Sequence, residues 1–353
     1  MLIYTLFIIF IVSGLFKHKV TKILSSENLP IVSVVIAARN EEKGLPYLIH
    51  DLVNQEYPLE KLEVVFINDR STDLTENILK EASENYSFIK NIKIEVKSEE
   101  MTPKKHALTK GIELAKGEVI ISTDADCRVG KLWVSSMTYD VIKNDSISIG
   151  FSSIKDQTFF DQYQKIDFLG IITANAGAGG WDQYWSGTGQ NLAYYKSDFR
   201  KINGFEPVKE KISGDDMYLV QSISKMKTGS INIDPNSFVK TEPMKNVKDF
   251  LNQRTRWSSN AKLNVKKSPY FFSFLANSLL INIIIFFSFL FSASWFSIFL
   301  IKFIFDGLVI FLGSKLFNLK VSFAPYLVWA FLQPFYIPFI AFMGLREKFT
   351  WKQ

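Results

Sequence analysis

The C-terminal part of the chain restricts its fold most strongly, because residues 269–343 are dominated by Phe, Ile and Leu. A helix that crosses a bilayer needs roughly 20 predominantly apolar residues. The region divides into three stretches near that length, at residues 270–291, 294–313 and 323–343. Lys302 and Asp306 lie four positions apart in the second stretch, so we expect them to pair or to face a protein interior. The sequence therefore predicts transmembrane helices over residues 269–344.

A shorter apolar run opens the chain. Residues 2–16 are mostly apolar, and Lys17, Lys19 and Lys22 follow directly. Because basic residues favour the cytoplasmic side of a span, this pattern predicts an N-terminal transmembrane anchor over residues 1–16, with a cytoplasmic domain after it. The competing interpretation is a cleaved signal peptide. It is disfavoured because the run lacks a basic start and a small-x-small cleavage site.

The number of C-terminal crossings is open from sequence. Three crossings that start from a cytoplasmic domain place Arg346, Lys348 and Lys352 outside the cell. That arrangement runs against the tendency of basic residues to stay inside. The alternative is that one of the three segments is re-entrant or interfacial.

Composition and charge exclude several classes of protein. With 353 residues, the chain is long enough for one soluble domain in addition to membrane segments. The single cysteine, Cys127, cannot form an internal disulfide, which suits a cytoplasmic domain. Residues 245–268 contain seven Lys or Arg and one acid, Asp249, so we expect this basic interfacial segment to lie on anionic lipid headgroups. No nucleic-acid-binding module accompanies it, and nucleic acid is excluded as a partner.

Residues 30–244 alternate between short apolar runs and helical stretches. The β-branched run at residues 31–38 is typical of a buried parallel strand. Similar runs are predicted as strands at residues 62–67, 92–96 and 119–122, with helices near residues 41–55, 73–84 and 105–116. This alternation predicts an α/β fold with a doubly wound, mostly parallel sheet, whose ligand lies at the carboxyl ends of its strands.

Two carboxylates follow the fourth predicted strand. Asp124 and Asp126 have the Asp-x-Asp spacing, and carboxylate oxygens are preferred ligands of Mg²⁺ and Mn²⁺. The ion would in turn grip the diphosphate of a bound nucleotide. A solvated turn is the alternative for so short a pattern. The position after a buried strand, together with the other motifs, favours a metal site at Asp124 and Asp126.

Asp69 and Lys104 are candidates for contacts with a nucleotide. Asp69 follows the second strand and could cap the next helix, but Ser71 or Asp73 can serve as that cap. Asp69 is then available to accept a hydrogen bond from a base or ribose. Lys104 precedes a helix and is predicted to contact a phosphate, the alternative being one more solvated lysine.

Asp215 and Asp216 form a pair of adjacent carboxylates. Acids at a helix start often serve as caps that interact favourably with the helix dipole. If one of them is buried beside a substrate, its neighbour's charge makes it a better proton acceptor. Asp216 is the predicted general base, because Asp215 suits the turn after Gly214 and the helix start.

The segment Gln253 to Trp257 precedes the apolar region. On a helix, Gln253, Arg256 and Trp257 share one face, since they are spaced i, i+3 and i+4. An alternative role for Arg256 and Trp257 is anchoring at the membrane interface.

A loop is expected over residues 170–189, where it would shape an acceptor pocket. Trp181, Tyr184 and Trp185 in that loop either stack on a sugar or pack in the protein.

Taken as a set, the motifs resemble the membrane-bound branch of the family-2 inverting glycosyltransferases. The resemblance covers roughly residues 30–260 and is carried by VSVVIAARNEE, INDRSTD, PKKHALTKG, STDADC, GTGQNLAYYK, GDDMYL and QRTRW. Two departures are Pro103, where many relatives have Gly, and Asp215, where Glu is commoner.

The resemblance implies a GT-A fold and a role for each matching residue. The residues implied around the nucleotide are Ala37, Arg39, Glu41 and Asp69. Lys104 would lie near the diphosphate, and Asp124 and Asp126 would serve nucleotide and metal. Asp216 would be the base. The residues implied to close the site are Gln253, Arg256 and Trp257.

The function expected from the sequence is hexosyl transfer in the cell envelope. A nucleotide-sugar, UDP-linked in the leading interpretation, would donate its sugar to a lipid or lipid-linked acceptor at the cytoplasmic face of the plasma membrane. A processive polysaccharide synthase is the first alternative, and a membrane-tethered nucleotide binder without catalysis is the second. The intact set of acids disfavours the binder, because binding alone needs no base.

Overall fold

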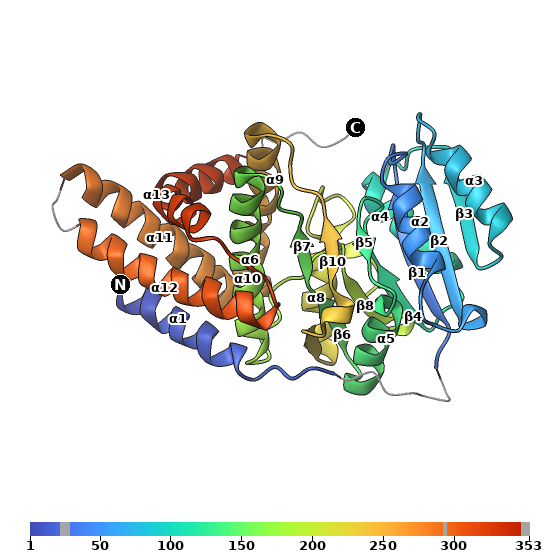
Figure 1. Cartoon of the computed structure of the whole chain (residues 1–353), viewed down its shortest axis with the longest axis horizontal. Coiled ribbons are helices and arrows are strands. Elements are labelled where there is room, and N and C mark those ends of the chain that lie inside the picture. Colours follow the sequence, from blue (N-terminus) through green and yellow to red (C-terminus); the bar gives the residue numbers. More distant parts are fainter. Residues whose placement is uncertain (22–28, 292–294, 347–353) are drawn as a thin grey trace. The chain divides into compact units, whose positions relative to one another are not determined.

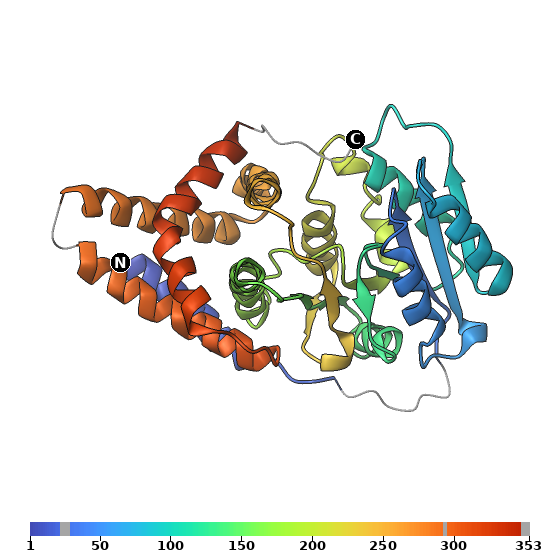
Figure 2. The same ribbon diagram turned by 45° about the horizontal axis from the view of Figure 1, so that its top comes forward.

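The computed structural model describes residues 1–21, 29–291 and 295–346. In it the chain divides into two compact units. The sheet unit comprises residues 19–153 and 186–242, and the helical unit comprises residues 1–18, 154–185 and 243–353. Figures 1 and 2 show the elements of both units in colours that follow the sequence.

The sheet unit is built on a seven-stranded sheet with the order β3-β2-β1-β4-β8-β6-β9. The first four strands in that order pair in parallel, while β8 runs antiparallel to both of its neighbours. A second sheet of three short strands has the order β5-β10-β7. The strands are β1 (Val32–Ala38), β2 (Leu62–Asp69), β3 (Ile89–Ile94), β4 (Val119–Ser122), β5 (Arg128–Val129), β6 (Ile147–Gly150), β7 (Ser152–Ile154), β8 (Leu192–Tyr195), β9 (Gly229–Asn232) and β10 (Val239–Thr241). The predicted mostly parallel α/β sheet is confirmed.

Helices cover both faces of this sheet, because alternate strand residues point to opposite sides. Val34 and Phe66 join the core shared with α2, α3 and α5. On the other face lies α4, where a Cβ on Gly111 would come within 2.4 Å of Ile67, so only glycine allows the helix to pack this closely. The helices of the unit are α2 (Leu45–Val53), α3 (Thr75–Asn85), α4 (Pro103–Leu114), α5 (Trp133–Asn144), α7 (Lys196–Lys201) and α8 (Asp215–Met226), with 3-10 helices η1 (Leu59–Lys61), η2 (Glu206–Val208) and η3 (Pro235–Ser237).

The helical unit contains three helices that are long and apolar enough to cross a membrane, namely α11 (Pro269–Phe291), α12 (Trp295–Leu316) and α13 (Phe323–Leu345). They match the three predicted segments to within a few residues. The other helices of the unit are α1 (Leu2–Leu15), α6 (Phe159–Gly179), α9 (Val247–Ser259), η4 (Asn260–Leu263) and α10 (Asn264–Lys267).

The predicted pairing of Lys302 and Asp306 is confirmed. Lys302 on α12 is buried, and its Nζ donates to Asp306 at 2.5 Å. The hydroxyl of Tyr4 on α1 donates to the same carboxylate. Both charged groups therefore face the interior of the helical unit, as expected for ionisable residues within a span.

Helices α1 and α6 approach each other closely along glycines. A Cβ on Gly14 would lie 1.8 Å from the carbonyl oxygen of Gly177, and a Cβ on Gly177 would lie 2.5 Å from the carbonyl oxygen of Ile11. Such close contact between helices depends on small residues. With 14 residues, α1 is shorter than the roughly 20 that a span needs. The transmembrane anchor over residues 1–16 stays a prediction.

Two expectations from the sequence are corrected here. Strand β3 starts at Ile89, three residues before the predicted start. The loop expected over residues 170–189 is wrong for residues 170–179, which form the last part of α6. This helix starts at a capping box between Thr158 and Asp161 and ends at Gly179. Glycines in this stretch provide close packing against α1 rather than a flexible loop.

Helix α6 also changes the predicted domain boundary. Residues 154–185 belong to the helical unit, although the predicted domain of residues 30–244 includes them. Trp185 is buried there and stacks on Phe271 and Phe274 at centroid distances of 5.1 and 5.0 Å. Trp185 is therefore a packing residue of the helical unit.

Candidate functional site

The predicted ligand contacts of the sheet unit lie at the carboxyl ends of parallel strands. Arg39 follows β1, Asp69 ends β2 and Asp124 lies two residues after β4. The register pairs Ala37 on β1 with Ile67 on β2, so Ala37 lies at the same edge. Because β2, β1 and β4 are neighbours in the sheet, these side chains share one end of it.

The loops after β1 and β2 are joined by hydrogen bonds. Asn40 and Arg70 both have a φ of 55°, a left-handed conformation that turns each loop sharply. The N–H of Thr72 donates to Asn40 Oδ1 at 2.8 Å, and the N–H of Glu41 donates to Thr75 Oγ1 at 2.9 Å. Arg39 and Glu41 are thus held on a loop with a defined conformation.

Asp69 does not cap the next helix, because Asp73 accepts the nearby backbone groups. The carboxylate of Asp73 accepts from the N–H of Thr75 at 3.0 Å and from the N–H of Glu42 at 3.2 Å. Asp69 is buried and accepts from Arg70 Nε at 2.8 Å. The guanidinium of Arg39 lies 3.9 Å from Asp69 Oδ2, to which Arg70 also donates at 3.1 Å. The structure therefore places Asp69 in an ion pair at the predicted nucleotide edge.

Lys104 and Asp124 form a direct ion pair. Lys104, in the first turn of α4, donates from Nζ to Asp124 Oδ1 at 2.7 Å. Burial alone would lower the pKa of the Lys104 ammonium, but the charges of Asp124, Asp215 and Asp216 outweigh burial and raise its pKa above the ordinary value. Lys104 is therefore a stable cation and not one more solvated lysine.

Asp126 lies on the same loop as Asp124, and this loop packs closely against the start of α2. A Cβ on Gly44 would lie 3.1 Å from both the carbonyl oxygen of Ala125 and the Cα of Asp126. Between the two acids and the next strand lies Cys127, whose thiol is buried. Burial, together with Asp124 and Asp126, raises the pKa of this thiol well above its usual value, so it is a neutral group and not a thiolate ligand.

Asp215 and Asp216 occupy the first turn of α8, after Gly214 with a φ of 87°. The carboxylate of Asp216 accepts from the N–H of Met217 at 2.7 Å and from the N–H of Gly189 at 3.3 Å. These backbone groups hold both of its oxygens in place.

Gly189 lies where the ammonium and the two carboxylates meet. A Cβ there would lie 3.6 Å from Lys104 Nζ, 3.9 Å from Asp215 Oδ2 and 4.0 Å from Asp216 Cβ. The structure thus brings together Lys104, Asp124, Asp215 and Asp216.

A metal ion would find two carboxylates here. Over residues 1–21, 29–291 and 295–346, no group of three or more His, Cys, Asp or Glu side chains is arranged to hold a metal. Mg²⁺, however, is commonly bound through one or two carboxylates plus the phosphates of a substrate. Asp124 and Asp126 fit that type of site, with the remaining ligands coming from a diphosphate and water.

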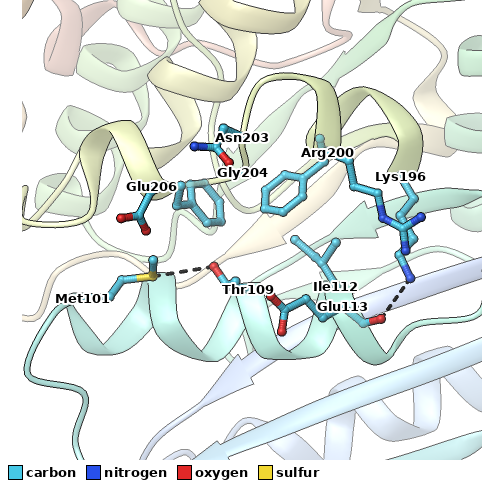
Figure 3. Close-up of a pocket in the computed structure, with 11 residues that line it drawn as sticks. Met101, Thr109, Ile112, Glu113, Lys196, Arg200, Asn203, Gly204 and Glu206 are labelled. Atoms are coloured by element: carbon cyan, nitrogen blue, oxygen red, sulfur yellow. Dashed lines mark hydrogen bonds between the residues drawn. The ribbon is translucent and has the colours of Figure 1, made fainter.

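The hollow shown in Figure 3 lies elsewhere in the sheet unit, between α4 and residues 196–206. Its volume is about 350 Å³, and Phe199, Phe205 and Ile112 form its apolar wall. None of the site residues predicted from sequence lines it. The candidate site rests on the polar groups around Lys104 and not on this hollow.

Gln253, Arg256 and Trp257 belong to the helical unit. They lie on α9, so the predicted helix and its shared face are confirmed. Trp257 packs on Phe168 of α6 at a centroid distance of 5.8 Å. The predicted role of these three residues in closing the site stays a prediction.

Arg254, which the sequence reasoning missed, anchors α9 within the helical unit. It is 2% exposed, and its Nε donates to Asp167 of α6 at 2.7 Å. Trp329 Nε1 of α13 donates to the other oxygen of Asp167 at 3.0 Å. The guanidinium lies 4.2 Å from the ring centroid of Trp257. A buried ion pair therefore joins α6, α9 and α13, and Arg254 is not one of the lipid-facing basic residues expected between 245 and 268.

Comparison with known proteins identifies the chain. The family models Glycosyl transferase family 2 and Glycosyl transferase family group 2 match residues 33–205 and 158–313. The fold and these matches define a glycosyltransferase. The chain belongs to glycosyltransferase family 2.

Similar proteins include bacterial and archaeal glycosyltransferases. The probable glycosyltransferase YdaM of Bacillus subtilis (strain 168) is 26% identical over 80% of this chain and 69% of its own length. The β-monoglucosyldiacylglycerol synthase of Nostoc sp. (strain PCC 7120) is 40% identical over 103 residues, which are 29% of this chain. The chain matches only 21% of that synthase.

Among solved structures, the mannosyltransferase PcManGT from Pyrobaculum calidifontis has the same fold. Its structure, in complex with GDP-Man and Mn²⁺, superposes with a TM-score of 0.61 at 16% identity. The likeness covers 96% of this chain and 93% of that one. The expected GT-A fold is thereby confirmed.

The buried pair of Arg254 and Asp167 generates a prediction about stability. Arg254→Met should leave Asp167 without its cation, and breaking a buried pair in this way costs roughly 3–5 kcal/mol. The melting temperature of the purified protein in detergent should fall clearly. Lys248→Met, on the same helix but exposed, is the matched control and should melt like the wild type. Equal melting of both variants and the wild type would contradict the anchoring role.

Proposed function

We propose that this protein transfers a hexosyl group from a nucleotide-sugar to a lipid or lipid-linked acceptor at the cytoplasmic face of the plasma membrane. The observation that carries the proposal is the meeting of Lys104, Asp124, Asp215 and Asp216 at the carboxyl end of a GT-A sheet. The three apolar helices support a membrane location. The names of two relatives, a β-monoglucosyldiacylglycerol synthase and a dolichyl-linked sugar transferase of Methanococcus voltae, support a lipid acceptor.

The proposed reaction is a single displacement. The hydroxyl oxygen of the acceptor forms a bond to the anomeric carbon while the bond from that carbon to the diphosphate breaks, so the configuration inverts. The hydroxyl proton passes to the carboxylate of Asp216, which the N–H groups of Met217 and Gly189 orient. Lys104 offsets the charge that develops on the departing diphosphate.

Other residues would bind the donor. Asp69, with Arg39, Ala37 and Glu41 on the neighbouring strand end, would contact the nucleoside. Asp124 and Asp126 would hold Mg²⁺ or Mn²⁺, and a divalent cation bound there would neutralise part of the diphosphate charge. The residues proposed to close the site from α9 are Gln253, Arg256 and Trp257. A UDP-linked donor is part of the proposal, and the GDP-Man bound to PcManGT makes guanosine donors the natural comparison.

Transfer of one sugar is favoured over processive synthesis. A pore around a growing polysaccharide needs many helices, whereas the described residues include three helices that are long enough to span.

The donor and acceptor can be identified together. Purified protein would be incubated with extracted membrane lipids and a panel of UDP- and GDP-linked sugars, and the lipids formed would be analysed by mass spectrometry. We expect one donor to give a lipid heavier by a single hexose. Ladders of many sugars would instead support the processive alternative.

The first prediction of this proposal concerns the general base. Asp216→Asn keeps the shape of the side chain and removes the proton acceptor, so transfer should fall about 10²–10⁴-fold while nucleotide binding survives. Asp124→Asn should instead weaken nucleotide binding, because Asp124 faces Lys104 and the proposed metal. Normal transfer by Asp216→Asn would exclude Asp216 as the base, and normal transfer by both Asp215→Asn and Asp216→Asn would exclude the mechanism.

The second prediction concerns the metal. Excess chelator should stop transfer, and Mg²⁺ or Mn²⁺ should restore it. Asp126→Ala should abolish transfer, whereas Glu84→Ala, an exposed acid on α3, should have no effect. Full activity in excess chelator would show that the Asp-x-Asp carboxylates do not act through a metal.

The third prediction concerns topology. The one native thiol is buried, so a cysteine introduced at the exposed Glu84 of the sheet unit can be labelled selectively. A membrane-impermeant maleimide should leave Glu84→Cys unmodified in intact cells and modify it after permeabilisation. Labelling in intact cells would place the sheet unit outside.

A further inference from the structure

Lys105 is a buried lysine beside the candidate site. It is 1% exposed and is one of the largest fully buried side chains among the described residues. Its neighbour Lys104 keeps 30% of its side chain exposed and faces Asp124. Successive residues of an α-helix point about 100° apart, so the two lysines serve different surroundings. A lysine is almost never fully buried unless its charge has partners.

One partner of Lys105 lies in the segment that leads to the paired acids, and another lies directly before α4. Its Nζ donates to the backbone carbonyl of Lys211 and lies 3.5 Å from Thr102 Oγ1. A second link runs parallel to the first, because the N–H of Thr102 donates to the carbonyl of Lys209 at 3.1 Å. The first turn of α4 is thus tied twice to residues 209–211.

The tied residues lie directly before the carboxylates of α8 in the chain. Residues 209–214 form no helix or strand of their own and end at Gly214, directly before Asp215. Lys104 belongs to the same first turn of α4, and its Nζ lies near Asp215 and Asp216 around Gly189. A hydrogen bond from a charged donor to a backbone carbonyl is stronger than a neutral one, so the buried ammonium is suited to fixing an otherwise irregular segment.

We propose that Lys105 is a positioning residue, which holds residues 209–214 against α4 and thereby sets the distance between Lys104 and the Asp215–Asp216 pair. Its effect on transfer rests on the proposed function, since the pair matters for turnover only if Asp216 is the base. The tie itself does not depend on that function. A misplacement of about 1 Å in a reacting group can cost about a hundredfold in rate.

The test compares Lys105→Met with Lys110→Met in the full-length protein. Methionine keeps the length and apolar stem of lysine and removes its charge and donors. Lys110 lies on the same helix with 53% of its side chain exposed, which makes it the matched control. Hydrogen-deuterium exchange of residues 209–217 should accelerate about tenfold or more in Lys105→Met, as expected on losing a charge-assisted hydrogen bond. It should not change in Lys110→Met.

A second variant keeps the test valid if Lys105→Met does not fold. Thr102 has a φ of −62°, which proline also adopts, so Thr102→Pro removes the N–H that donates to Lys209 and keeps the φ of residue 102. It should accelerate exchange in the same segment. In both variants kcat should fall at least about tenfold while the dissociation constants for UDP and GDP change less than about threefold, because the nucleotide edge of the sheet is untouched.

The outcomes separate this proposal from the function on which it rests. Unchanged exchange at residues 209–217 in both variants would overturn the tie, whatever the activity. The positioning role would be overturned if exchange became faster while kcat stayed normal. It would also be overturned if exchange became faster and only the affinity for UDP and GDP decreased. If the wild type transferred no sugar from any donor while exchange responded as expected, the proposed function would fail and the tie would stand.

Discussion

One cation allows three carboxylates to share a small space. Asp124, Asp215 and Asp216 come from a strand end and a helix start that lie about 90 residues apart in the chain, and their charges repel each other when no counter-charge is near. Lys104 supplies that charge at 2.7 Å from Asp124. A bound nucleotide would add the negative charge of its diphosphate to this cluster, and its metal ion would add positive charge. The arrangement is thus suited to exchanging ionic partners during a reaction cycle.

The helical unit uses buried charge in a different way. Asp167 and Arg254 are both nearly inaccessible and are surrounded by Trp329, Phe250 and Trp257. A buried pair adds little net stability compared with apolar packing, but it strongly disfavours arrangements in which either partner lacks the other. The pair therefore fixes how α9 rotates relative to α6 and α13. That rotation decides in which direction the face with Gln253 and Arg256 points.

Elements with a periodic hydrophobic pattern could be predicted from the sequence. The burial of single charged side chains could not. The strands at β1, β2 and β4 and the three apolar helices follow from runs of β-branched or apolar residues, whose spacing reports directly on structure. The acids after those strands follow from the rule that ligands lie at carboxyl ends. Lys105 and Arg254 were missed because each lies among other basic residues that keep more of their surface exposed, and only tertiary packing distinguishes them. Helix α6 was mistaken for a loop up to Gly179 because glycines that serve close packing resemble glycines that serve flexibility.

The contact between α1 and α6 has a consequence for biosynthesis. Helix α1 is made before its glycine-lined partner, which begins at Phe159, and Asp306, which accepts a hydrogen bond from Tyr4, is made later still. At about 5–20 residues per second, a ribosome needs on the order of 10 to 30 s to travel from α1 to α6. An apolar helix must be sheltered by lipid or by a chaperone during that interval. The contact of Tyr4 with Asp306 can therefore form only after the whole sheet unit, which ends at residue 242, has been synthesised.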